Sequence, residues 1–301
     1  MASEPAADRT LTISSDALAA TFVPDVGMLG TSIRHSGAEV LDLAGGIDGY
    51  RAGHVTGLPL LAPWANRLGA PRYEAAGVAV DVTGLELHTD GNGLPIHGTM
   101  TAQGGWQVGR VDDRSFSAEF DFGARPDLLA SFPFPHRLQI EAAVDESTLR
   151  IATTVEATAD RAVPITFGYH PYLCLPGVGR ADVHLRLPDR RHAELDDRQL
   201  PTGRELVEVG EDEPVGSRRF DDLYRLGDDR RLALRGGGRA VTIELGEGYR
   251  YFQVYTPPTG DSVCLEPMTA AVNALVDGGY ELARPGAPVT ATFSLRVEAS
   301  R

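Results

Sequence analysis

Two residues of this chain, His170 and Glu266, have the side chains and the surroundings for acid–base chemistry. His170 ends the apolar run Ile165–Tyr169 and is followed by Pro171, and Glu266 ends a second apolar run before Pro267. Proline lacks an N–H and fixes φ, so we expect each strand to stop at its ionisable residue. An imidazole and a carboxylate held in this way suit proton transfer near neutral pH. For His170 the structural alternative is a core histidine bonded to a backbone carbonyl.

A carboxylate in an apolar stretch is seldom idle, because burying it costs free energy unless it is paired. The negative net charge and a nearby carboxylate also predict that the pKa of His170 is raised in its site. Glu266 and His170 are therefore the first candidates for a base and an acid.

The segment Gly57–Gly69 contains two prolines and a closing glycine, which makes a helix improbable. We expect an extended, partly buried loop that presents Trp64, Asn66 and Arg67 to a ligand. The structural alternatives are core packing for Trp64 and a solvated surface charge for Arg67.

Two further polar residues lie where the backbone could approach a ligand. His97 precedes Gly98, which permits close approach, although a turn histidine is an equal alternative. Asp221 lies in the segment Phe220–Tyr224, between two aromatic residues in a polar zone. It could accept hydrogen bonds from a sugar hydroxyl or from a histidine, although an Asp that caps a turn is the more common case.

Composition limits the possible chemistry. The chain has 301 residues, a formal net charge of −14 and, although Lys and Arg together number 28, no lysine at all. The negative charge argues against nucleic acid and anionic membranes as partners. Without lysine, Schiff-base chemistry and a phosphate-binding lysine are excluded. The eight histidines do not show the spacing of a metal site.

The elements that must position these residues are predicted to be β-strands. Period-two alternation and turn residues predict strands at 11–14, 17–23, 29–34, 39–41, 106–111, 115–122, 137–144, 148–157, 164–169, 182–187, 232–234, 240–245, 249–255, 262–268 and 289–297. Many short, mostly antiparallel strands imply an all-β sandwich of two large sheets. No shift of composition divides the chain, so we expect a single domain over residues 1–301.

The remaining segments are predicted to be irregular or helical. Residues 42–53 form a glycine-rich loop, residues 269–276 one or two helical turns, and residues 189–216 a charged surface excursion without an apolar face.

Cysteine content and hydropathy suggest a compartment. Cys174 and Cys264 are far apart and are expected to be free thiols. The first ten residues lack an apolar signal region, and no run approaches the ~20 apolar residues of a membrane span. A cytoplasmic protein, monomeric or homodimeric, is expected.

Four short motifs occur in a fixed order: Asn66-Arg67, His97-Gly98, His170-Pro171-Tyr172 and Leu265-Glu266-Pro267. Together they resemble the aldose 1-epimerase (galactose mutarotase) family, and the resemblance extends over nearly the whole chain. It implies a β-supersandwich of the galactose mutarotase-like kind. It also implies that Glu266 is the general base and His170 the general acid, and that Arg67, His97 and Asp221 bind sugar hydroxyls. Asn66, next to Arg67 in the loop, is expected to be a further substrate-binding residue.

The chemistry implied is interconversion of the α and β anomers of a hexose such as glucose or galactose. One carboxylate and one imidazole suffice for it, so no metal or other cofactor is expected. The alternatives are a hexose-6-phosphate 1-epimerase and a non-catalytic carbohydrate-binding protein of the same fold. A glycosidase would need two facing carboxylates, and only Glu266 lies in a buried context.

Overall fold

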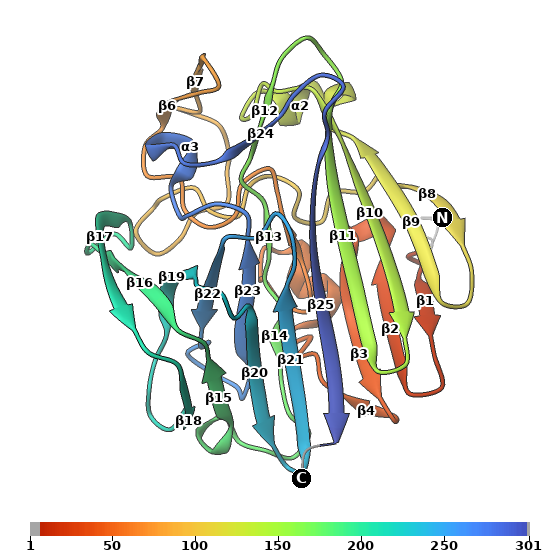
Figure 1. Cartoon of the computed structure of the whole chain (residues 1–301). Helices are drawn as coiled ribbons and strands as arrows, with labels where there is room; N and C mark the ends of the chain where they lie inside the picture. The colour runs from red at the N-terminus through yellow and green to blue at the C-terminus, as the bar shows by residue number, and fades with distance from the viewer. Residues whose placement is uncertain (1–6, 300–301) are drawn as a thin grey trace.

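The computed structural model describes residues 7–299, and antiparallel strands make up most of its regular secondary structure (Figure 1). The largest sheet has nine strands in the spatial order β18 (Glu211–Pro214), β15 (His184–Leu187), β20 (Arg231–Gly236), β21 (Arg239–Leu245), β25 (Val289–Ala299), β11 (Thr148–Ala157), β10 (His136–Asp145), β9 (Ser115–Asp121) and β8 (Gln107–Val111).

The second sheet has eight strands and carries the chemistry described below. Its order is β17 (Pro201–Glu208), β16 (Arg190–Leu195), β19 (Asp221–Leu226), β22 (Tyr251–Tyr255), β23 (Val263–Met268), β13 (Gly168–Tyr169) and β5 (Leu60–Leu61), with β14 (Tyr172–Leu173) also paired to β23. The predicted all-β sandwich with two large sheets is confirmed.

A four-stranded N-terminal sheet packs against β9, β10 and β11. Its strands are β1 (Leu11–Ser14), β2 (Leu18–Val23), β3 (Leu29–His35) and β4 (Ala38–Glu39). The smaller elements are the strand pairs β6 (Arg72–Ala75) with β7 (Val78–Asp81) and β12 (Val163–Ile165) with β24 (Glu281–Ala283), and the short helices α1 (Gly46–Arg51), α2 (Pro126–Leu129) and α3 (Ala274–Asp277).

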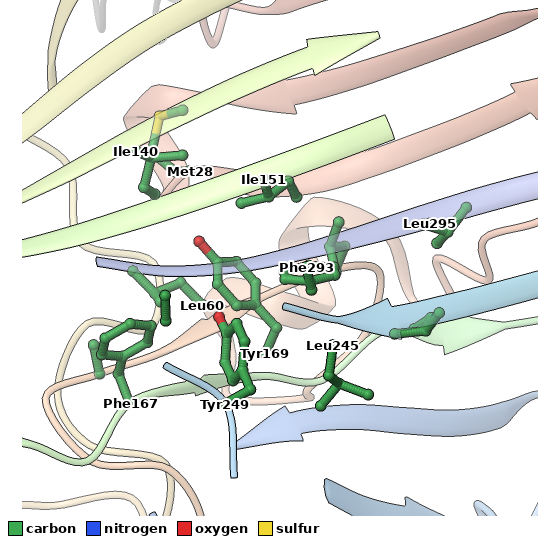
Figure 2. Close-up of a cluster of buried hydrophobic side chains, with 14 of the residues drawn as sticks. Met28, Leu60, Ile140, Ile151, Phe167, Tyr169, Leu245, Tyr249, Phe293 and Leu295 are labelled. Carbon is green, nitrogen blue, oxygen red and sulfur yellow. The ribbon is translucent and has the colours of Figure 1, made fainter. Parts of the chain in front are cut away.

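Alternating side chains build the core between the sheets. On β10, Leu138, Ile140, Ala142 and Val144 are all buried, while the residues between them face outward. Figure 2 shows Tyr169 of β13 beside Phe293 of β25, with ring centroids 5.1 Å apart. The eight-stranded sheet therefore packs directly on the nine-stranded one, and its other face is left for the loops around the site.

Two sequence predictions about irregular segments are wrong. Residues 189–216 contain β16, β17 and β18 rather than a surface excursion. Those strands lie at or next to sheet edges, with much of β17 exposed on both faces, so no alternation of apolar residues marked them. Residues 42–53 include helix α1 instead of loop alone, and the helix predicted at 269–276 is the single turn α3.

Cys174 and Cys264 are free thiols, as predicted. Within residues 7–299, no helix has the length and apolar character needed to cross a bilayer.

Candidate active site

His170 is fixed by the short strand before it. The side chain of Tyr169 points into the core, where its hydroxyl lies 2.7 Å from Thr153 Oγ1. Successive residues of a strand point to opposite faces, so His170 is directed away from the core. Its own N–H donates to the carbonyl of Pro59 at 3.2 Å. Pro171 then separates β13 from β14, as the sequence predicted.

Glu266 lies in the middle of β23, and the prediction that its strand stops there is wrong. The carbonyl of Met268 accepts from Arg250 N on the β22 side, so the nitrogen of Pro267 points to the opposite side. That side faces the interval between β13 and β14, where β23 has no ladder partner. The missing N–H of Pro267 therefore removes no ladder hydrogen bond, and the strand continues.

The structure brings the two candidate catalytic groups together. Nε2 of His170 lies 3.2 Å from Oε1 of Glu266, and their side chains are only 6% and 2% exposed. The ring of Tyr172 stacks on the His170 ring, with centroids 4.6 Å apart and an interplanar angle of 8°. Nδ1 of His170 and Oε2 of Glu266 are buried and have no hydrogen-bond partner within residues 7–299.

Burial favours the neutral form of both groups. It lowers the pKa of His170 to about 3, and it raises the pKa of Glu266 well above its usual range, with the nearby Asp221 carboxylate adding to the rise. The expectation of a raised pKa for His170 is wrong, because the loss of solvation outweighs the attraction of neighbouring carboxylates. The pair as a whole holds one exchangeable proton over a wide range of pH.

Asn66 and His97 are held to each other through unusual backbone geometry. Both have positive φ, 60° and 64°. The N–H of Asn66 donates to Nδ1 of His97 at 3.3 Å, and the N–H of His97 donates to the carbonyl of Asn66 at 3.0 Å. Nδ1 is thus an acceptor, and the neutral ring carries its proton on Nε2. Burial lowers the pKa of His97 well below its usual range, so the ring stays neutral.

The Arg67 side chain is largely shielded from solvent and surrounded by acceptors. Its Nε donates to Asp90 Oδ2 at 2.7 Å, Nη2 to Asp221 Oδ2 at 2.9 Å and Nη1 to Asn66 Oδ1 at 3.2 Å. The Arg67 side chain is 10% exposed and that of Asp90 only 7%. Two carboxylates therefore compensate one guanidinium, which leaves this wall of the site with excess negative charge.

The structure also separates two adjacent acids. Asp221 faces the cavity and accepts from Gln253 Nε2 at 2.6 Å as well as from Arg67. Asp222 points to the other face of β19, where His192 Nε2 lies 3.2 Å from its Oδ1. Gln253 is itself paired with Glu266 across β22 and β23, and its Oε1 is buried without a partner in the described part of the chain.

These residues surround one cavity of about 350 Å³. All six predicted site residues line it: Asn66, Arg67, His97, His170, Asp221 and Glu266. The other lining residues were not predicted from the sequence: Gly53, Val55, His88, Asp90, Gly91, Ile96, Tyr172, Gln253 and Tyr255. Trp64 does not line the cavity and packs in the main core, which was its structural alternative.

A larger hollow of about 740 Å³ lies elsewhere, between β15, β16 and β19, and neither His170 nor Glu266 lines it. Two of the arginines that line it are already paired with carboxylates: Arg186 with Asp229 at 2.6 Å, and Arg190 with Glu211 at 3.2 Å. Within residues 7–299, no group of three or more His, Cys, Asp or Glu side chains has the geometry of a metal site. The buried His–Glu pair makes the smaller cavity the candidate active site.

Residues 9–296 match the sequence model of the family described as aldose 1-epimerase. The chain belongs to the aldose 1-epimerase family. No curated protein matches it.

Solved structures share the fold of this family member at low identity. A galactose mutarotase-like protein from Clostridium acetobutylicum has a TM-score of 0.85 and 19% identity, covering 97% of this chain and 96% of that one. An aldose epimerase homologue from C. elegans has a TM-score of 0.81 and 16% identity, with coverages of 98% and 100%. A galactose 1-epimerase from Lactobacillus acidophilus has a TM-score of 0.75 and 13% identity, with coverages of 98% and 100%.

Proposed function

We propose that the protein is an aldose 1-epimerase that interconverts the α and β anomers of an unphosphorylated hexose such as glucose or galactose. The observation that carries the proposal is the 3.2 Å contact between His170 Nε2 and Glu266 Oε1, two side chains that are almost fully shielded from solvent and line a polar cavity. An acid and a base side by side can exchange protons with two neighbouring oxygens of a sugar, the C1 hydroxyl oxygen and the ring oxygen.

In the proposed mechanism, the Glu266 carboxylate accepts the proton of the C1 hydroxyl, and Nε2–H of His170 donates a proton to the ring oxygen. The bond between C1 and the ring oxygen breaks, giving an open-chain aldehyde. Rotation about the C1–C2 bond presents the other face of the carbonyl, and the reverse transfers close the ring. Each positioned acid or base contributes roughly 10²–10⁴-fold to such a step.

The working form must carry its single proton on His170, with Glu266 ionised. Burial alone favours the opposite placement, with a neutral imidazole and a protonated carboxyl. Both placements contain the same number of protons, so passage between them needs only transfer along the 3.2 Å contact. A C1 hydroxyl donating to Glu266 would favour the ionised carboxylate.

The other lining groups would hold the sugar. Asn66, Arg67, His97 and Asp221 are proposed ligands of the ring hydroxyls, since together they offer amide, guanidinium, N–H and carboxylate groups. Gln253 joins them because its Oε1 is a buried acceptor beside Asp221. Holding the ring in one orientation is itself catalytic, since it removes orientational freedom before the transfers begin.

The charge of the cavity favours a neutral sugar over a hexose 6-phosphate. Arg67 is the only arginine among the lining residues, and its guanidinium already bonds Asp90 and Asp221. The carboxylates of Asp90 and Asp221 would therefore repel a phosphate dianion, and the Arg67 guanidinium that could attract it is already bonded to them.

Polarimetry tests the proposal with freshly dissolved α-glucose, α-galactose and α-glucose 6-phosphate. We expect the protein to accelerate approach to anomeric equilibrium for at least one neutral hexose above the rate in buffer alone. A higher kcat/KM for glucose 6-phosphate would contradict the substrate class. Sugar binding without any acceleration would identify a carbohydrate-binding protein that has lost turnover.

A further inference from the structure

The end strand β17 differs from the other ends of the two large sheets. The edge strand β18 has only four residues, three acids and a proline, the edge strand β8 is interrupted by a register shift, and β5 has two residues. Each of these features discourages pairing with another chain. β17 spans the eight residues Pro201–Glu208 at the outer margin of its sheet (Figure 1), and although its pairing with β16 also has a register shift, residues 205–208 pair with β16 in unbroken register.

Apolar side chains are concentrated on this same edge. Only five large apolar side chains are exposed within residues 7–299, and three of them are Leu206, Val207 and Val209, at 66%, 75% and 80% exposure. Leu206 and Val207 point to opposite faces of β17, so apolar surface flanks the free edge on both sides. One side of the β17 backbone is bonded to β16, and the N–H and C=O groups directed the other way face no strand of the sheet.

We propose that β17 pairs with β17 of a second copy of this chain, giving a twofold dimer in which the two eight-stranded sheets join. A twofold axis through the edge makes the two strands antiparallel. The inference does not depend on the proposed enzymatic activity.

The sequence of β17 favours one register. If Leu206 lies opposite Leu206 of the second copy, Arg204 lies opposite Glu208 on both sides of the axis. Opposite charges then face each other twice, with Arg204 added to the contacts that Glu208 already makes to Arg190 and His192 at 2.7 Å, and two leucines meet at the centre. Two other registers are less favourable. If the axis passed through Glu205, Glu205 would face Glu205 of the second copy. If it passed between Leu206 and Val207, Glu205 would face Glu208, so both registers place like charges opposite each other. The guanidinium of Arg204 is 77% exposed and bonds Glu194 through Nε alone, so its Nη atoms remain available on the described surface.

Light scattering coupled to size-exclusion chromatography tests the dimer over a wide range of protein concentration. We expect the wild-type chain to have twice the mass of one chain, and the double variant Leu206→Arg/Val207→Arg to have the mass of one. The matched control is Val111→Arg, which places the same charge on an exposed apolar residue of the end strand β8. It should stay dimeric, and circular dichroism should show that all three proteins are folded.

Cysteine cross-linking tests the register. In the proposed pairing, residue 206 faces itself with Cβ atoms ~4.5–5.5 Å apart, close enough for a disulfide after slight adjustment. Residue 209 lies opposite residue 203, so two copies of residue 209 are about 20 Å apart along the strands. Under mild oxidation, Leu206→Cys should therefore give a covalent dimer on non-reducing gels, while Val209→Cys and the wild-type chain should not.

Three results would overturn the inference. The first is a wild-type chain that is monomeric at every concentration. The second is assembly beyond a dimer, which would mean that the edge is adhesive without forming a closed pair. The third is a covalent dimer from Val209→Cys and none from Leu206→Cys.

Discussion

At the scale of single residues, the site depends on burying an acid and a base so that they share one proton. Burial lowers the pKa of His170 and raises that of Glu266, so a second proton is added only at low pH and the shared proton is lost only well above the usual range of a carboxyl group. The one-proton state proposed to be active therefore covers a wide pH interval. This assignment is the reverse of a simple picture in which Glu266 sets the acid limit and His170 the alkaline limit.

The pH dependence of kcat/KM follows from these directions. We expect no loss of activity as the pH falls through about 6.5, the ordinary pKa of histidine. Burial lowers the pKa of His170 to about 3, so the His170–Glu266 pair gains its second proton only far below 6.5. The alkaline limit should lie well above 4.5, the ordinary pKa of a glutamate, because burial raises the pKa at which Glu266 loses the shared proton. Polarimetric rates, corrected for mutarotation by buffer and measured where circular dichroism shows intact fold, test this. An acid limit close to 6.5 would contradict it.

At the scale of elements, the site depends on loops that are fixed to one another by buried polar contacts. Asp90, which was not predicted from the sequence, is the clearest case. Its Oδ1 accepts from the N–H groups of Asn92 and Leu94, each at 2.9 Å, while Oδ2 bonds Arg67. One carboxylate thus shapes the turn that leads to His97 and orients the guanidinium.

Asp90→Asn should weaken sugar binding without destroying the fold. The amide keeps one oxygen for the turn but removes the charge that faces Arg67. A lost hydrogen bond to a charged group costs ~1.5–3 kcal/mol, so kcat/KM should fall about tenfold or more, chiefly through KM. The control Asp81→Asn breaks an exposed Arg–Asp contact of 2.8 Å with Arg72 and should leave kinetics unchanged. Equal kinetics for the two variants would contradict a positioning role for Asp90.

Gly98 fixes the loop that carries His97. Its φ is +67°, and a Cβ at this position would overlap the carbonyl oxygen of Ala62. Gly98→Ala should therefore lower both the melting temperature and sugar affinity. Gly93→Ala is the matched control, because φ is +74° there with no atom within 4 Å of the added Cβ. The control should lose only the ~1–2 kcal/mol of left-handed strain. Equal losses of stability would exclude the steric explanation.

The sequence predicted the structure correctly where a single local feature, such as apolar alternation, proline or glycine, determines the backbone conformation. Alternating apolar residues predicted most strands, and proline and glycine marked the loops around His97 and His170. It was uninformative for β16 and β17, since strands exposed at a sheet edge have no apolar face. Asp90 lies in a turn of ordinary composition, and nothing local distinguishes it. Gln253 could have been found by pairing the strands on either side of the Pro257–Asp261 turn, which places it opposite Glu266.

At the scale of the whole molecule, the fold brings residues 66, 97, 170, 221 and 266 to one face of the eight-stranded sheet. The formal charge of −14 surrounds that face with a net negative field. A neutral sugar experiences little of it, whereas an anionic sugar is repelled at long range.

Ionic strength should therefore separate the two substrate classes. We expect kcat/KM for a neutral hexose to stay constant as sodium chloride is added, while any activity on glucose 6-phosphate rises, because salt screens the repulsion. Sodium sulfate at matched ionic strength serves as a control for specific chloride effects. A fall with salt for the phosphorylated sugar would reveal a basic attraction site and reverse the expected preference.

The most direct test of the account is the rate of mutarotation of fresh α-hexose by wild type and Glu266→Gln. The amide is nearly isosteric with the carboxylate but cannot accept the C1 proton. Glu266→Gln should therefore keep its fold and its affinity for sugar, measured by calorimetry, and lose at least a hundredfold in kcat, the lower end of the ~10²–10⁴ attributed to a positioned base. A folded, sugar-binding variant whose kcat stays within tenfold of wild type would contradict the central claim that Glu266 is the base.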